Sequence, residues 1–119
     1  MRKLKTKEHW LSINGFPNYE VSNHGKIRSV ERIQKINGYE RLLISKELST
    51  NICNRGWCNV MLSVEGKGYS RRVHRLVAEH FLPLKKDKNK VLHVDGDRRN
   101  NHIDNLRWVS YIGKDYYVC

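Results

Sequence analysis

The chain has 119 residues, a length typical of one domain or of two very small modules that share a core. This length excludes a large enzyme fold such as a barrel or a dinucleotide-binding domain. Lys and Arg outnumber Asp and Glu by 23 to 12, and the resulting net charge of +11 is typical of a nucleic-acid-binding domain, although a basic ribosomal or membrane-surface protein would share it.

The rest of the composition narrows the cellular setting. No stretch approaches the roughly 18 apolar residues of a membrane span, and the basic first ten residues lack the apolar run of a signal peptide. The cysteines, Cys53, Cys58 and Cys119, are odd in number, and the absence of a signal peptide predicts a reducing cell interior in which they are free thiols. We expect no zinc site, because Cys53 and Cys58 are too far apart for a C-x₂-C knuckle and no second Cys or His pair with the standard spacing of zinc ligands follows them.

Residues 8–30 predict a small antiparallel β unit. Turn-forming residues at 14–15 precede the alternating segment 19–22, which predicts a half-buried strand. The Asn-His-Gly sequence at 23–25 is typical of a hairpin connection, and residues 26–30 supply the expected return strand.

A β-rich region follows over residues 31–72, with a predicted hairpin at residues 64–68. Its strands are expected at residues 42–44, 57–62 and 69–73. Residues 1–89 carry 18 basic and 8 acidic side chains, whereas residues 90–119 carry five and four. The first segment is therefore expected to meet phosphates, and the carboxylates in the last segment gather for another reason.

The hydrophobic period then changes to that of a helix. Apolar residues at helical spacing predict a helix over residues 73–82, which Pro83 ends. Two short strands, at residues 91–94 and 106–109, flank a polar loop, and Ser110 is placed to cap a final helix from Tyr111. The sequence predicts an α+β fold: an antiparallel β module, one helix, and a β-β-α unit.

The β-β-α unit holds the residues with the clearest chemistry. It places His93 on one strand, across a loop of Asp, Arg and Asn from the other strand. Hydrolysis of a phosphodiester needs a base to deprotonate water, and histidine ordinarily titrates near neutral pH. It also needs a cation beside the phosphate, and Mg²⁺ prefers oxygen ligands with several waters retained.

Two motifs carry a resemblance to a known family. The run from His93 through Asp95-Gly96 and Asn100-Asn101 to residues 105–108 (Asn-Leu-Arg-Trp) resembles the HNH motif of phage and intron homing endonucleases. Residues 73–78 resemble the helix that precedes this motif. Residues 10–30 resemble the NUMOD4 type of DNA-binding module, so the resemblance covers roughly residues 8–110.

The resemblance implies three segments and a set of roles. The segments are a NUMOD4-like DNA-binding module at 1–30, a β-rich connecting region at 31–72 that faces DNA, and the HNH ββα-metal nuclease motif at 73–119. His93 is the implied general base, and Asn105 is the asparagine that orients it and braces the loop.

The family also implies a divalent metal, with Mg²⁺ favoured and Mn²⁺ as the alternative. One family ligand position falls on Leu92, which cannot bind a metal. The other falls near residues 113–115, where Asp115 is the candidate, and Asp95 is a further candidate.

The expected partner is double-stranded DNA, with neither a membrane nor a small-molecule substrate. We expect the protein to be a monomer in the interior of a bacterial or phage-infected cell, and not secreted. The candidate DNA contacts are basic: Lys26, Arg28, Arg71, Arg72, Arg98 and Arg99.

Several other residues keep two interpretations. His80 shares the apolar face of the predicted helix and is expected to pack, whereas His74 either packs or bonds to the motif loop. His102 is a loop histidine or a phosphate contact. The three tryptophans are expected in the core instead of stacking on bases; they are Trp10, Trp57 and Trp108.

Three functions therefore compete. A metal-dependent DNA endonuclease of the homing type, which nicks or cuts DNA, explains the complete run that begins at His93. A DNA-binding protein with a decayed nuclease fold explains Leu92 in a ligand position. A basic RNA-binding or ribosome-associated module leaves the whole run unexplained.

Overall fold

The computed structural model describes residues 7–84 and 90–109. Helix α1 spans Val73–Phe81, and a 3₁₀ turn spans Ile103–Asn105. No helix in this part of the chain is long and apolar enough to cross a membrane. The strands are β1 (Trp10–Ile13), β2 (Phe16–Ser22), β3 (Ile27–Ser29), β4 (Arg32–Ile36), β5 (Tyr39–Leu43), β6 (Lys46–Glu47), β7 (Asn51–Ile52), β8 (Cys58–Val64), β9 (Lys67–Arg72), β10 (Lys90–His93) and β11 (Leu106–Val109).

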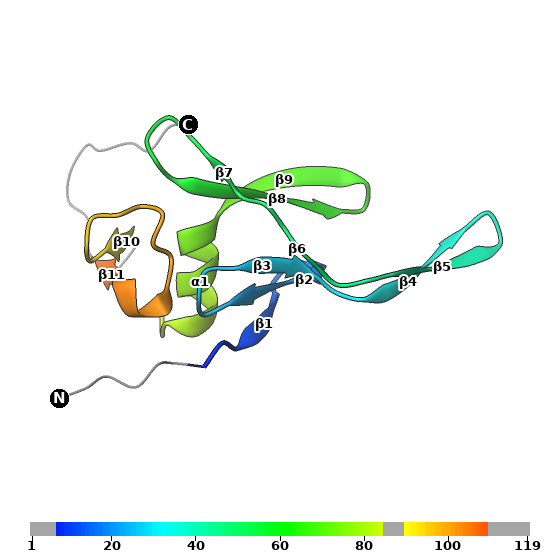
Figure 1. The fold of residues 1–119 in the computed structure, drawn as a ribbon, viewed down its shortest axis with the longest axis horizontal. Coiled ribbons are helices and arrows are strands. Elements are labelled where there is room, and N and C mark those ends of the chain that lie inside the picture. The colour runs from blue at the N-terminus through cyan, green and yellow to red at the C-terminus, as the bar shows by residue number, and fades with distance from the viewer. Residues whose placement is uncertain (1–6, 85–89, 110–119) are drawn as a thin grey trace.

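The strands form four antiparallel groups. Two sheets have the strand orders β1-β2-β3-β6 and β7-β8-β9, and two further pairs are β4-β5 and β10-β11. Figure 1 shows α1 between the β10-β11 pair and the two larger sheets. The expected α+β fold, with one helix between an antiparallel β region and a ββ pair, is confirmed.

Most predicted elements form where the sequence placed them. The hairpins β2-β3 and β8-β9 pair as expected. Helix α1 begins at Val73 as predicted but ends at Phe81, because Pro83 drives Leu82 to an extended backbone (ψ 136°). The predicted helix from Tyr111 lies outside the described residues.

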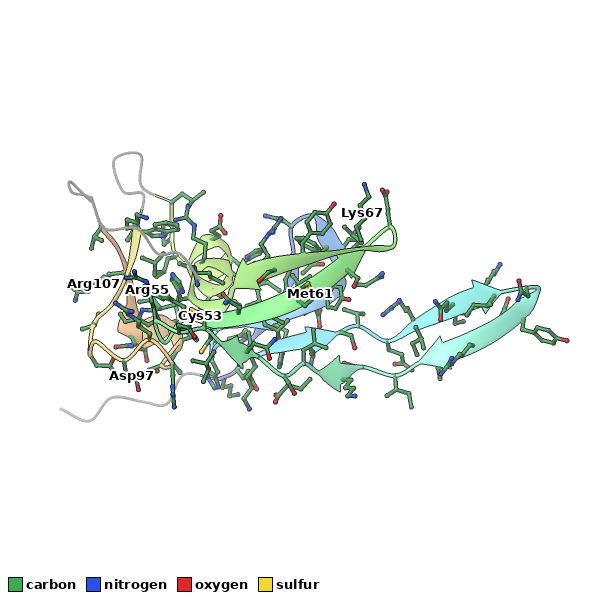
Figure 2. The ribbon with its side chains drawn as sticks, turned by 90° about the horizontal axis from the view of Figure 1, so that it is seen from above. Cys53, Arg55, Met61, Lys67, Asp97 and Arg107 are labelled. Atoms are coloured by element: carbon green, nitrogen blue, oxygen red, sulfur yellow. The ribbon has the colours of Figure 1, made fainter. Side chains whose placement is uncertain are left out.

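The ribbon β4-β5 was only partly predicted. It turns through Asn37 and Gly38, both with positive φ (49° and 83°), as a two-residue hairpin connection requires. The ribbon projects away from α1 (Figures 1 and 2). It contributes to a Cα radius of gyration of 16.2 Å, against about 13 Å for a compact domain of this size. Most of its side chains are exposed, Tyr39 at 78%, whereas Arg32 and Leu43 at its base are half-buried.

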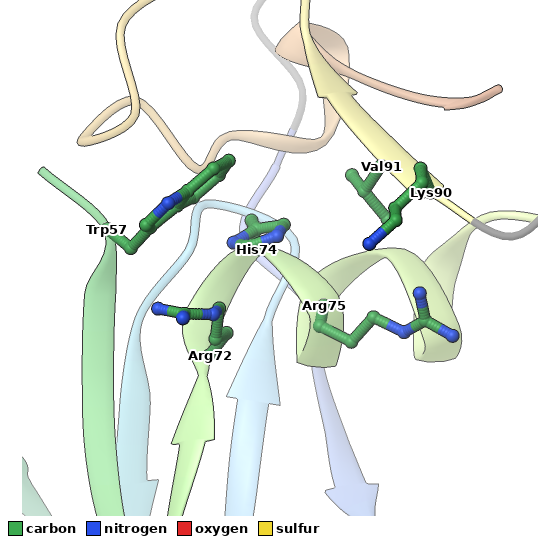
Figure 3. A pocket seen from close by; sticks show the side chains of 6 residues that line it. All are labelled: Trp57, Arg72, His74, Arg75, Lys90 and Val91. Atoms are coloured by element: carbon green, nitrogen blue, oxygen red, sulfur yellow. The ribbon is translucent and has the colours of Figure 1, made fainter. Parts of the chain in front are cut away.

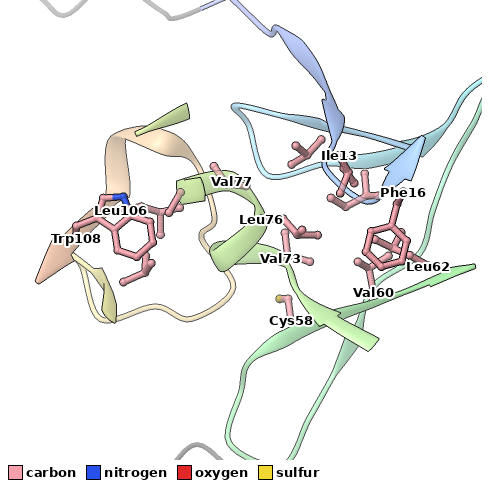
Figure 4. Packing of buried hydrophobic residues seen from close by; sticks show 14 residues of the cluster. Ile13, Phe16, Cys58, Val60, Leu62, Val73, Leu76, Val77, Leu106 and Trp108 are labelled. Atoms are coloured by element: carbon pink, nitrogen blue, oxygen red, sulfur yellow. The ribbon is translucent and has the colours of Figure 1, made fainter. Parts of the chain in front are cut away.

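One hydrophobic cluster joins the N-terminal sheets to the β10-β11 pair. Helix α1 lies between them: Leu106 and Trp108 are on one side of it, and Phe16 and Leu62 are on the other, next to Val73 and Leu76 (Figure 4). Burial of apolar area on both sides of one helix stabilises the two regions as a unit. The motif is therefore fixed against the N-terminal β region through α1.

The tryptophan and cysteine expectations hold in part. Trp57 and Trp108 are buried as predicted, but Trp10 is half-buried outside the main cluster, under the guanidinium of Arg28. Cys58 is a buried free thiol. Cys53 takes part in a disulfide, so the expectation of free thiols is wrong for this residue.

Candidate active site

The β10-β11 pair frames His93 as the sequence predicted. His93 lies opposite Leu106, and Val91 lies opposite Trp108. Because side chains alternate along a strand, Val91 and His93 turn inward while Leu92 turns to solvent. The exposed fractions agree: His93 is 5% exposed and Leu92 is 49% exposed. The imidazole is thus held at the inner end of a short strand, next to the polar loop.

Asn101 fixes the orientation of this imidazole. Its Oδ1 lies 2.8 Å from His93 Nε2, and an amide oxygen can only accept a hydrogen bond. The neutral ring therefore carries its proton on Nε2 and leaves a lone pair on Nδ1. The sequence had assigned this orienting contact to Asn105, but the structure places Asn101 at the ring nitrogen instead.

Asn105 braces the loop between the two strands. Its Oδ1 accepts from the backbone N–H of Asp95 (3.0 Å). Its Nδ2 donates to Asp95 Oδ1 and to the backbone oxygen of Asn100, both at 2.9 Å. Asn105 is only 8% exposed, so these bonds replace contacts with water that burial removes. The expected bracing contacts are present; the orienting contact with His93 is made by Asn101.

Asp95 holds the loop together from the other side. Its carboxylate accepts from Asn100 Nδ2 at 2.9 Å, from the backbone N–H of Asp97 at 2.8 Å, and from Asn105. These hydrogen bonds, that of Asn100 first, lower the pKa of Asp95 below its usual range. Three of the roughly four acceptor positions of the carboxylate are therefore in use.

The described residues do not by themselves make a divalent metal site. No three His, Cys, Asp or Glu side chains gather anywhere in residues 7–84 and 90–109. Leu92 offers no donor atom at the position before His93, and Asp95 is largely occupied by the loop. Asp115, the other candidate ligand, lies outside the described residues.

Four of the candidate DNA-binding residues lie in different parts of the fold. Arg28 pairs with Glu20 at 2.8 Å, and Lys26 lies 3.8 Å from Glu47, so carboxylates offset both charges. Arg71 lies beside the rings of Phe16 and Tyr69. Arg99 is exposed in the loop after β10.

Arg72 and Arg98, in contrast, come together at Trp57. Their guanidinium carbons lie 5.6 Å and 4.4 Å from the Trp57 ring centroid, within the range of cation–π attraction. Arg98 also donates to the backbone oxygen of Arg55. Two residues 26 positions apart in sequence thus form one basic edge beside the motif.

His74 and Trp57 form one wall of the site. The sequence left the role of His74 open and assigned Trp57 to the core. The ring of His74 lies 5.0 Å from that of His93 and 4.7 Å from that of Trp57. Burial lowers the pKa of His74 to about 3, and the charge that His93 carries when protonated, with the charges of Arg72, Arg75 and Lys90, acts in the same direction. His74 is therefore neutral at physiological pH. Its place next to arginines at the start of α1 was the available signal.

The remaining histidines have structural contacts. His80 is half-buried, and its Nδ1 lies 2.7 Å from the backbone oxygen of Leu76, while its Nε2 accepts from the Asn14 N–H. His102 stacks on His24 with ring centroids 4.7 Å apart. The stacking of His102 on His24 joins the β2-β3 turn to the motif loop.

That turn touches the loop at two further points. The backbone N–H of Ile103 donates to the backbone oxygen of Asn23 at 2.8 Å. Gly25 approaches Asn101 so closely that a Cβ at residue 25 would lie 2.8 Å from Asn101 Cβ. The N-terminal module therefore lies directly behind the asparagine that orients His93.

His93 lies on the first of two strands joined by a loop, and Asn101 of that loop orients its ring. Helix α1 packs against this pair of strands. The arrangement defines a nuclease-like ββ unit joined to a β-rich module. Two family models match the chain: the NUMOD4 motif over residues 8–63 and the HNH endonuclease over residues 71–111. The chain belongs to the HNH homing endonuclease family, with an N-terminal NUMOD4 module.

Individual relatives agree with this assignment. DNA endonuclease I-HmuI of Bacillus phage SP01 is 35% identical over 102 residues, which are 85% of this chain and 52% of the relative. The uncharacterized HNH endonuclease L247 of Acanthamoeba polyphaga mimivirus is 34% identical over 101 residues, 84% of this chain and 22% of the relative.

A solved structure shows the same fold. The structure of DNA binding and cleavage by the HNH homing endonuclease I-HmuI superposes with a TM-score of 0.67 at 35% identity. It covers 86% of this chain and 52% of the other chain. This chain therefore spans about half the length of that phage relative.

Proposed function

We propose that this protein is a metal-dependent DNA endonuclease of the homing type, with His93 as its general base. The observation that carries the proposal is the bond between His93 Nε2 and Asn101 Oδ1 within the HNH motif. It keeps the basic lone pair on Nδ1, the state that a base needs before it takes a proton from water. We further propose that the protein acts as a monomer inside a bacterial or phage-infected cell.

The residues of this chain supply orientation and charge to the reaction. Asn101 holds the His93 ring, and Asn105 with Asp95 holds the loop that carries Asn101. HNH nucleases generally use a divalent metal, which stabilises negative charge on the phosphate and on the leaving oxygen. Asp115 is our proposed ligand, and Asp95 is a weaker one because of its loop contacts.

Nicking of supercoiled plasmid tests the function directly. With Mg²⁺ or Mn²⁺ we expect conversion to the open circular or linear form, because the oriented base is in place. EDTA should abolish the conversion. Binding without cleavage under every divalent metal would refute the nuclease proposal and leave a DNA-binding protein.

That DNA-binding protein with a decayed nuclease site is the second candidate. Two observations favour it: the exposed Leu92 before the base, and the Asp95 carboxylate already bonded by three donors. Leu92→Asp separates the two candidates. Gain of cleavage or of metal affinity in this variant would identify Leu92 as a lost ligand position.

The β4-β5 ribbon is our proposed DNA-contacting arm. A two-stranded ribbon fits the major groove of DNA. Pairing of Gln34 with Arg41 and of Arg32 with Leu43 puts both arginines on one face. On the opposite face Lys35 lies across from Glu40, which offsets its charge. The arginine face is therefore the one expected to meet phosphates.

The salt dependence of duplex binding tests this arm. Arg32→Gln with Arg41→Gln should make the slope of log affinity against log salt shallower by about 1.8, because each neutralised phosphate contributes about 0.9. Lys35→Gln on the opposite face is the control and should change the slope little. Equal slopes for the double variant and the unmodified protein would exclude this face of the ribbon from DNA contact.

A further inference from the structure

A cavity of about 200 Å³ lies beside the candidate base and has no part in the mechanism above. It is smaller than the roughly 300–1,000 Å³ pockets that hold drug-sized ligands, so it suits a small group. Figure 3 shows the six residues that line it: Trp57, Arg72, His74, Arg75, Lys90 and Val91.

Positive charge dominates this cavity. Arg72 comes from the end of β9, Arg75 from α1 and Lys90 from the start of β10, so three separate elements bring cations to one place. None of the described lining residues is acidic. Glu79, with its carboxylate 3.8 Å from Arg75 Nε, offsets part of one of these charges. The described lining therefore favours an anion over a cation.

His74 gives a second, independent indication of a ligand. It is only 7% exposed, and its Nδ1 is buried with no hydrogen-bond partner among the described residues. Buried polar atoms are nearly always hydrogen-bonded, so an exception calls for a partner beyond the described residues, such as a bound ion or ligand. Because His74 is neutral, its Nδ1 accepts or donates according to the tautomer, and a bound anion would select the tautomer with the N–H on Nδ1.

We propose that this pocket binds a backbone phosphate of the DNA strand, next to the phosphate presented to His93. The inference rests on the proposed function. The His74 ring lies 5.0 Å from that of His93, and Val91 precedes His93 by two residues on β10. A strand that crosses the site would therefore reach both places with neighbouring phosphates.

Binding of this neighbouring phosphate would help to position the phosphate that reacts. Arginine side chains bind phosphate oxygens through two parallel N–H bonds and so fix position as well as charge. Binding energy from a phosphate that does not react would hold the reacting phosphate in line with His93. The pocket residues are thus positioning residues, and none of them is assigned to the chemical step.

Ring ¹⁵N resonances of His74 in the full chain test the pocket without cleavage. The probes are the thymidine dinucleoside monophosphate, which carries one phosphodiester and no terminal phosphate, and inorganic phosphate. We expect the phosphodiester to shift the His74 resonances saturably. Arg75→Gln with Lys90→Gln should abolish the shift. Lys35→Gln with Lys67→Gln makes the same change of charge on the β4-β5 ribbon and at the β8-β9 turn, outside the pocket lining, and should preserve the shift.

Duplex binding supplies the second measurement. Arg75→Gln with Lys90→Gln should reduce the salt slope by about 0.9, the contribution of one phosphate, and should raise KM for DNA. Backbone amide spectra of the variants show whether they fold. The inference is overturned if the phosphodiester leaves the His74 resonances unchanged, or if inorganic phosphate alone shifts them.

The outcome is separable from that of the proposed function. If the unmodified protein cuts no plasmid but its His74 resonances still respond to the phosphodiester, the nuclease proposal fails and the phosphate pocket stands. If the protein cuts plasmid but the double variant keeps the full salt slope, the pocket inference alone fails.

Discussion

Replacing His93 with alanine should lower metal-dependent cleavage by about 10²–10⁴-fold, the usual cost of losing a general base. Affinity for uncut duplex should change little, because an imidazole that takes one proton stabilises the transition state far more than the bound ground state. Single-turnover cleavage and equilibrium binding, measured on the same variant, separate the two effects.

Asn105→Ala is the matched comparison for this experiment. It removes three hydrogen bonds that brace the loop, so it should lower the free energy of unfolding and affect cleavage less than His93→Ala does. Urea denaturation provides the stability measurement. Cleavage that survives His93→Ala at the unmodified rate would show that another residue is the base.

The sequence predicted the elements whose side chains are buried on one face. Residues 73–82 repeat their apolar side chains at helical spacing, and the strands around His93 and Trp108 alternate, so burial and local pattern agree. The β4-β5 ribbon escaped complete prediction because its side chains are exposed on both faces, which removes the alternation that marks a strand. The turn residues Asn37 and Gly38 were the signal that could have located it.

The site was predicted in its components but not in all its contacts. The motif identified His93 and Asn105 correctly as neighbours of one loop, but only the folded loop shows that Asn101 reaches the ring. The wall formed by Trp57 and His74 is a tertiary feature, since β8, α1 and β10 bring together residues far apart in sequence. Local pattern carries no information about such a meeting.

The close contact between the N-terminal module and the motif loop makes Gly25 a sensitive position. Its φ is +85°, and a Cβ there would lie 2.8 Å from Asn101 Cβ and 2.9 Å from the Asn101 backbone oxygen. Gly15 has the same φ of +85°, but a Cβ at residue 15 would meet nothing within 4 Å. The two glycines therefore share backbone strain and differ in the clash with Asn101.

Alanine at each of these positions measures how strongly the N-terminal module supports Asn101 and the proposed base, His93. Gly15→Ala should cost about 1–2 kcal/mol of stability from the positive φ alone. Gly25→Ala should cost about 1–3 kcal/mol more, because a methyl group is forced into a packed contact.

Cleavage gives the decisive contrast between the two variants. At a temperature where both are folded, as judged by their urea transitions, Gly25→Ala should cut DNA at least about 10-fold more slowly than Gly15→Ala, because small misplacements of reacting groups cost up to about 100-fold. The loss should appear in kcat, since the contact of Asn101 is with the proposed base, His93. Equal rates would mean that the β2-β3 turn supports the fold but has no influence on the orientation of His93.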